Sequence, residues 1–324
     1  MISLHINKAK SVQEFFKVEI EEQRSSALQK LQAINANIFD QAEQTYLNNI
    51  ITQFQDISFL TKSPLEIEVI KGIVGPLPAN SRFETVNGVL KPMKKQLTHF
   101  IQNALNYTNC RDKFYPKYFR KIGIKSCVYC NSQLTVVITK KNNEIDARLE
   151  VDHHYPKSDF PFLSISLFNL YPCCASCNKR KSSTPINFFL YTDITSKLSK
   201  SDYNFKITKS SECDYLVTKD AESIEILFND VSTTVAGHQS LQNMFSIKEI
   251  HDTQKDIIAE LIVKNQIYNE SFKDILQKSF SKLSLSQNDF DRVIVGNYTK
   301  EKDIHKRPFS KMTMDIAKQL GLIK

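Results

Sequence analysis

Residues 127–130 read CVYC and residues 174–177 read CASC, two C-x-x-C pairs separated by a segment long enough for a hairpin. Each turn lets two thiolates bind one ion while nearby backbone amides stabilise their charge, and two turns complete a tetrahedron. The spacing therefore predicts a structural Zn²⁺ site whose ligands are Cys127, Cys130, Cys174 and Cys177. Four thiolates leave no open position, so this ion would clamp the frame and take no part in chemistry. The adjacent Cys173 is expected to be a small buried residue.

Between and beside the cysteine pairs lie residues of two chemical kinds, possible bases and possible oxygen ligands for a metal ion. Residues 150–158 read EVDHHYPKS, and residues 177–181 read CNKRK. An imidazole, which this stretch offers twice, has a pKa suited to taking a proton from water near neutral pH. A hard divalent cation that neutralises the phosphate prefers oxygen ligands, here Asp152 and the amide oxygen of Asn178. The stretch therefore offers both a base and oxygen ligands for a hard cation.

This arrangement resembles the zinc-braced HNH (ββα-metal) endonucleases, in which D-H-x-x-P ends a strand and C-N-x-x-K lies on the following helix. The resemblance implies that His153 is the general base and that Asp152 and Asn178 hold a catalytic Mg²⁺ or Mn²⁺ ion. Asn169, nine positions before Asn178, would orient the His153 ring or hold the loop. Adjacent residues of a regular strand point to opposite faces. Asp152 and His153 can therefore serve one site only if the backbone bends between them or if the scissile phosphate lies between their side chains.

Three cations near this motif are candidates for substrate contact: Lys157, Arg180 and Lys181. Lys181 follows Asn178 by three residues and shares its helix face, so its ammonium would either contact the substrate phosphate or lie exposed on the helix. His154 is an alternative base or metal ligand, but a strand histidine on the other face is the favoured interpretation.

The flanking sequence narrows the resemblance. Residues 118–131 read YFRKIGIKSCVYCN, and residues 307–311 read RPFSK. From about 114 to 320 the chain is similar to the HNH subunit of Septu-type bacterial antiphage systems, the PtuB-like proteins, which also occur in some retron loci. That similarity implies a defence role and an ATPase partner related to ABC and SMC proteins.

The chain is expected to fold as an α+β, mostly helical protein with three regions. Residues 1–108 would form a helical region, residues 109–190 a zinc-braced, treble-clef-like ββα-metal core, and residues 191–324 an α+β or helical region. The predicted strands cover 134–139, 147–152, 203–208 and 223–228, and the predicted helices include 91–106 and one opened by Tyr171-Pro172. Ser11 and Ser246, each with glutamate three residues on, are predicted to begin helices with a capping box.

The whole chain has 324 residues and a formal net charge of +8, which is compatible with a nucleic-acid partner. Basic and aromatic residues alternate over 111–121, a pattern that suits single strands by stacking and duplexes by charge. No apolar run reaches 18 residues and the N-terminus lacks a secretion signal, so we expect a cytoplasmic protein without membrane contact.

Three alternatives remain open beside a DNA nuclease, which we favour. The same site would also serve an RNA nuclease acting, for example, on tRNA. A zinc-ribbon module would bind nucleic acid without cutting it and would not need His153. A scaffolding protein would use its helical ends to bind other proteins and would retain a degenerate nuclease centre.

Overall fold

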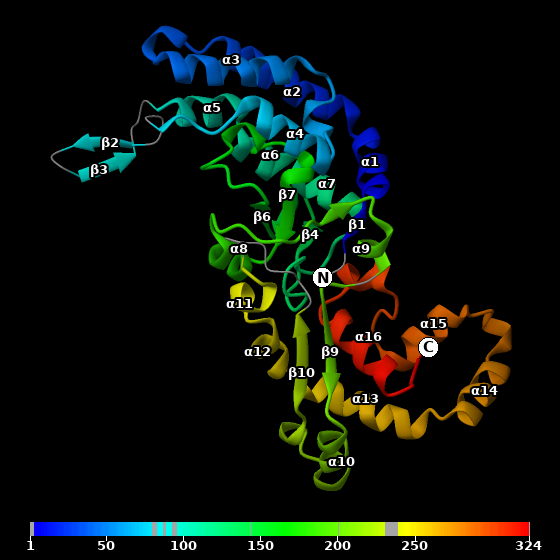
Figure 1. Ribbon diagram of the computed structural model, residues 1–324. Helices are drawn as coiled ribbons and strands as arrows, with labels where there is room; N and C mark the ends of the chain where they lie inside the picture. Colours follow the sequence, from blue (N-terminus) through cyan, green and yellow to red (C-terminus); the bar gives the residue numbers. More distant parts are fainter. Residues whose placement is uncertain are drawn as a thin grey trace.

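A computed structural model describes residues 3–79, 96–142, 144–199, 201–230 and 239–323, and the backbone of 83–86 and 89–92. The chain is mostly helical, with small two-stranded sheets, as the sequence predicts (Figure 1). Within these ranges, none of the helices is both long and apolar enough to cross a membrane.

Helices dominate the N-terminal part, which lies at one end of the molecule (Figure 1). They are α1 (Ile6–Phe15), α2 (Lys17–Gln32), α3 (Gln41–Gln55), α4 (Pro64–Val74), α5 (Leu97–Leu105), α6 (Tyr107–Lys113) and α7 (Tyr115–Ile122). Before α5, β2 (Phe83–Val86) and β3 (Val89–Pro92) form an antiparallel hairpin, so the helix predicted over 91–106 is wrong in its first part. Gly123 ends α7 with φ 82°, a left-handed conformation that favours glycine, and the chain turns there toward Cys127.

The predicted capping boxes at Ser11 and Ser246 are wrong. Ser11 lies inside α1, which begins five residues earlier with the His5 side chain accepting a hydrogen bond from the Asn7 N–H. A helix does begin directly after Ser246, as predicted, but Ser246 has φ 52° and makes no side-chain cap. Capping boxes do form at Asp40, which begins α3, and at Ser63, which begins α4.

The centre of the molecule contains two short antiparallel sheets and one helix. The strands are β4 (Val136–Thr139) with β5 (Ile145–Arg148), and β6 (Glu150–His153) with β7 (Leu170–Cys173); the helix is α8 (Ala175–Lys181). The strand predicted over 147–152 is thus divided at Leu149 between two sheets. The helix predicted to open at Tyr171-Pro172 begins instead at Ala175, because those two residues pair with β6.

The C-terminal part returns to helices around one larger hairpin. Its strands are β8 (Tyr191–Thr192), β9 (Tyr203–Ile207) and β10 (Ile226–Asp230), and the last two pair antiparallel near the predicted positions. Its helices are α9 (Thr195–Ser199), α10 (Lys209–Thr218), α11 (Leu241–Phe245), α12 (Ile247–Asp252), α13 (Lys255–Ile267), α14 (Glu270–Ser279), α15 (Gln287–Val295) and α16 (Ser310–Gln319).

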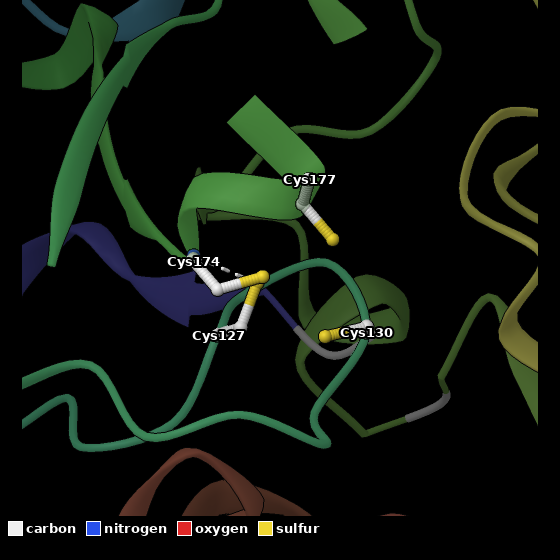
Figure 2. A group of neighbouring side chains, drawn as sticks. All are labelled: Cys127, Cys130, Cys174 and Cys177. Carbon is white, nitrogen blue, oxygen red and sulfur yellow. Dashed lines mark hydrogen bonds between the residues drawn. The ribbon is translucent and has the colours of Figure 1, made fainter. Parts of the chain in front are cut away.

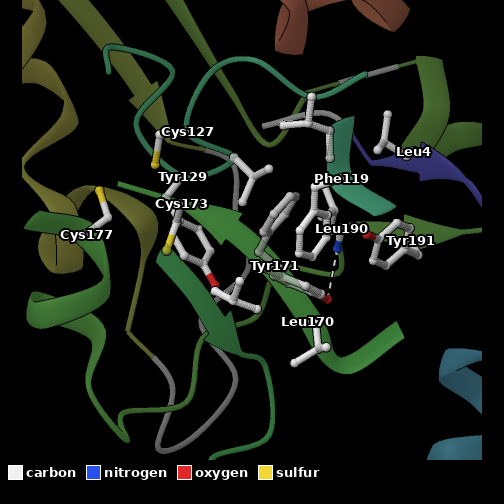
Figure 3. Packing of buried hydrophobic residues seen from close by; sticks show 14 of the residues in the cluster. Leu4, Phe119, Cys127, Tyr129, Leu170, Tyr171, Cys173, Cys177, Leu190 and Tyr191 are labelled. Carbon is white, nitrogen blue, oxygen red and sulfur yellow. Dashed lines mark hydrogen bonds between the residues drawn. The ribbon is translucent and has the colours of Figure 1, made fainter. Parts of the chain in front are cut away.

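One continuous core joins all three regions that the sequence distinguishes. The buried hydrophobic cluster runs from Leu4 near the N-terminus to Ile323 near the C-terminus. β1 (Leu4–His5) pairs in parallel with β8, so the start of the chain lies beside residues that follow the central helix. Figure 3 shows the packing between them, where the Leu190 N–H donates to the Tyr171 hydroxyl at 3.0 Å. The regions therefore share a core and do not pack as separate units.

Candidate functional site

The four predicted cysteines lie together. Cys127 and Cys130 come from the turn after α7, Cys174 immediately precedes α8, and Cys177 lies in the first turns of α8 (Figure 2). All four are buried, and their sulfur atoms lie within 4.8 Å of one another. A tetrahedral Zn²⁺ with sulfur ligands needs such a set, so this cluster could hold a metal ion such as zinc.

Hydrogen-bond donors point at two of these sulfurs. The Cys174 backbone N–H donates to Cys127 Sγ at 3.3 Å, and the Ser132 hydroxyl donates to Cys130 Sγ at 3.1 Å. Hydrogen bonds from the neighbouring thiols lower the pKa of Cys130 and of Cys174, whereas burial raises the pKa of Cys127. Donors near sulfur stabilise the thiolate, which is the form that binds metal. Cys173 is buried outside the cluster, and burial raises its pKa, as expected for a packing residue.

Asn131 fastens the first cysteine pair to the C-terminal part of the chain. It is fully buried with φ 53°, and its amide donates to the Ser126 hydroxyl at 2.9 Å and to the Ile304 carbonyl at 2.8 Å. Its side-chain oxygen accepts from the Lys311 N–H at 2.9 Å, in the first turn of α16. The RPFSK segment at 307–311 therefore helps to hold the cysteine turn in place.

Asp152, in β6, is buried beneath α8 and has two hydrogen-bonded partners. Its Oδ2 accepts from the Tyr129 hydroxyl and lies 3.1 Å from Lys181 Nζ, and its Oδ1 lies 3.3 Å from the same Nζ. Burial raises the pKa of the Asp152 carboxyl, against the opposing effect of the Lys181 charge. An ammonium group thus neutralises this carboxylate inside the protein.

His153 has one ring nitrogen engaged. Its Nε2 lies 3.0 Å from the Ser164 carbonyl oxygen, which can only accept. In the neutral ring Nε2 must therefore carry the hydrogen, and Nδ1 keeps the lone pair that a base requires. Burial lowers the pKa of His153 to about 3, with the Lys157 and Lys181 charges acting in the same direction, so the ring is neutral at pH 7.

The side chains of Asp152 and His153 have different neighbours. Both residues belong to the regular ladder of β6, where Asp152 pairs with Tyr171 and His153 pairs with Leu170. The Asp152 carboxylate contacts Tyr129 and α8, whereas the His153 ring packs 4.8 Å from the Tyr107 ring of α6. β6 contains no bend between Asp152 and His153. If both residues serve one site, the scissile phosphate must therefore lie between the two side chains.

Asn169 holds the loop between β6 and β7, one of its two predicted roles. Its side-chain oxygen accepts from the Tyr155 N–H at 2.7 Å, and its amide donates to the Leu163 carbonyl at 3.0 Å. Leu163 directly precedes Ser164, whose carbonyl contacts His153. Asn169 therefore positions the His153 ring indirectly, through the backbone of this loop.

The other candidate residues differ in accessibility. Asn178 is half-buried in α8, three residues before Lys181. Lys157 is exposed, with Nζ 5.2 Å from the centre of the Tyr107 ring. Arg180 is exposed and donates to the Ser246 hydroxyl at 3.0 Å. These positions leave both cations accessible from solvent.

Lys181 and His154 are both buried. The sequence placed Lys181 on an exposed helix face or against a substrate phosphate, but its side chain is fully buried against Asp152. Lys181 is buried because β6 lies directly under the last turn of α8 and covers the helix face that carries Lys181, a face that would be exposed in an isolated helix. His154 follows the last residue of β6, and its ring stacks on the Tyr171 ring at 5.3 Å.

Three residues that sequence reasoning missed contact the candidate site. Tyr129 lies within the CVYC segment, and its position between two cysteines was the available signal. Ser164 acts through its backbone carbonyl, and Tyr107 comes from a distant helix, so neither carries a sequence signal.

Comparisons with protein-family models, with curated proteins and with solved structures each find no match for this chain. A function can therefore be argued only from its own residues and their geometry.

Proposed function

We propose that this chain is a metal-dependent endonuclease of the HNH type, acting on DNA. The observation that carries the proposal is the succession of β6, β7 and α8, with Asp152 and His153 at the end of β6 and Asn178 on α8. A metal ion held by the four cysteines would fasten the start of α8 to the turn after α7 and so fix α8 relative to that turn.

The donor chemistry suits a hard divalent cation. Asp152 and Asn178 offer carboxylate and amide oxygens, which Mg²⁺ and Mn²⁺ prefer. Such an ion, when bound, supplies neutralisation of the phosphate charge. The cysteine cluster differs in kind, since its four sulfur ligands suit Zn²⁺ and leave no position for substrate.

His153 would act as the base. Its Nε2–H donates to the Ser164 carbonyl, so the hydrogen bond sets the tautomer and leaves Nδ1 to accept a proton from water. The low pKa that burial and the two lysine charges give His153 keeps the ring unprotonated, but it also makes the ring a weak base. A phosphate anion beside the ring would raise this pKa toward neutrality, because it favours the protonated form. Lys157, exposed near the ring, would attract that anion.

The biological role is proposed from the resemblance to PtuB-like proteins alone. It would be antiphage defence, with an ATPase related to ABC and SMC proteins as partner. Co-purification with such an ATPase, followed by comparison of cleavage with and without it, tests this part separately from the chemistry.

The nuclease proposal is tested by incubating the purified protein with supercoiled plasmid, single-stranded DNA and tRNA in Mg²⁺ or Mn²⁺. We expect plasmid nicking, and a fall of about 100-fold or more when His153 is replaced by alanine, the usual cost of losing a general base. His99→Ala is the matched control, because His99 is an exposed histidine. Cleavage of tRNA alone would favour the RNA alternative, and plasmid binding without cleavage would favour the zinc-ribbon module. Equal cleavage by wild type and His153→Ala contradicts the proposed role of His153.

A further inference from the structure

Lys181 is one of the few fully buried lysines of the described chain, and its ammonium group contacts two residues of β6. Its Nζ lies 3.1 Å from Asp152 Oδ2 and 3.3 Å from Oδ1, and it donates to the His153 backbone carbonyl at 2.8 Å. An ammonium has three donors and no acceptor, so these contacts use most of its capacity. The side chain is thus held by the two residues that the proposed reaction needs.

The Asp152 carboxylate is correspondingly occupied. Lys181 lies within ion-pair distance of both oxygens, and the Tyr129 hydroxyl donates to Oδ2. A divalent cation bound to this carboxylate would stand beside the ammonium inside a buried site, where like charges repel strongly. Mg²⁺ also demands close, near-ideal ligand geometry, which a carboxylate shared with an ammonium does not offer.

We propose that Lys181 is the resident counter-ion of Asp152 and that its ammonium must withdraw before a divalent cation binds there. This inference rests on the proposed function, since it concerns the same metal ligand. The buried Asp152 carboxylate would have a positive charge beside it both with and without the metal ion, so neither form leaves an isolated charge in the interior. Lys181 therefore sets the affinity of the site for metal and keeps the metal-free site closed.

The position of Lys181 permits such a withdrawal. It is the last residue of α8, and the chain leaves the helix at Ser182, whose φ of 49° and ψ of −124° break the helical path. Residues 182 and 183 are exposed, so the flexible side chain needs to swing only from the interior to the adjacent surface. There the negative end of the helix dipole favours a positive charge.

The test measures Mn²⁺ affinity of the zinc-loaded full chain by electron paramagnetic resonance of free Mn²⁺. Lys181→Met retains most of the side-chain length and removes the competing charge, so we expect Mn²⁺ to bind at least tenfold more tightly than to wild type. Lys179→Met is the matched control, an exposed lysine on the same helix, and should leave the affinity unchanged. Adding Asp152→Asn to Lys181→Met should abolish the gain.

A second measurement uses the wild-type chain and does not depend on the folding of a variant. An amine-specific reagent followed by mass spectrometry should leave Lys181 unmodified without Mn²⁺ and modify it when Mn²⁺ is present. Equal labelling in both conditions overturns the inference. The inference is also overturned if Mn²⁺ affinity depends on Asp152 but does not improve in Lys181→Met. In that case cleavage that depends on His153 would still support the proposed nuclease. If cleavage and Mn²⁺ binding are both independent of these residues, the proposed function itself fails.

Discussion

Replacement of Asn131 by alanine tests whether the cysteine turn depends on the C-terminal part of the chain. The change removes the side chain that accepts from the Lys311 N–H and donates to the Ile304 carbonyl, which would keep only a 3.4 Å contact with the Ser126 hydroxyl. Because Asn131 is fully buried, solvent does not reach these groups to replace the lost hydrogen bonds. Each unsatisfied buried group costs about 1–3 kcal/mol. Alanine in the left-handed conformation that Asn131 adopts, with φ 53°, adds about 1 kcal/mol. The expected loss of stability is therefore about 3 kcal/mol or more.

Two further variants separate the contributions. Asn131→Gly loses the same hydrogen bonds but adopts positive φ freely, so it should be about 1 kcal/mol more stable than Asn131→Ala. Asn103→Ala, at an exposed asparagine, is the control for the substitution itself. The assay is urea unfolding followed by circular dichroism, with Zn²⁺ supplied equally to all samples. A loss below 1 kcal/mol for Asn131→Ala would refute the buried network, and equal stability of the two variants would refute the conformational part.

Three other outcomes are expected. Cys177→Ser should lower bound zinc and the urea midpoint, whereas Cys213→Ser, at an exposed cysteine outside the cluster, should change neither; unchanged zinc by elemental analysis in Cys177→Ser would exclude the four-sulfur site. His251 is buried, and burial lowers its pKa to about 4, so the unfolded chain takes up the proton first and stability falls as the pH drops below about 6.5. Wild type should lose about 1.3 kcal/mol more than His251→Phe between pH 7.5 and 5.5, and parallel losses in urea titrations at the two pH values would contradict this. Tyr107→Phe keeps the ring against His153 and should nick plasmid within a few-fold of wild type, while Tyr107→Ala should be much slower; an equally active Tyr107→Ala would show that the ring does not position His153.

The sequence was a reliable guide where residue type and characteristic spacing carry the signal. The two C-x-x-C pairs predicted a cluster that the fold brings within 4.8 Å, and alternating residues predicted β9 and β10 close to their observed places. The same kind of local rule failed at Ser11, and at Ser246 it predicted the start of α12 correctly but a capping box that does not form. A serine followed by glutamate offers a helix start, but packing decides whether the chain uses it, and α1 begins earlier because β1 pairs with β8 just before it.

The strand β7 illustrates the limit more sharply. Tyr171-Pro172 suggested a helix start because proline is favoured in a first turn. In the structure Pro172 pairs with Val151 of β6, and the pairing partner lies some twenty residues away in sequence. A pattern of neighbouring residues cannot predict a contact between residues so far apart in the sequence.

The sequence by itself determined which donor groups the chain offers: four cysteines at metal-binding spacing, and Asp152, His153 and Asn178 as candidates for a hydrolytic site. It did so because these properties depend on residue type and on spacing along the chain. Only the tertiary structure decided what surrounds those groups. It buried Lys181 against Asp152, aimed the Ser164 carbonyl at His153 and tied Asn131 to α16. These contacts join residues from different elements, and they depend on how the elements pack.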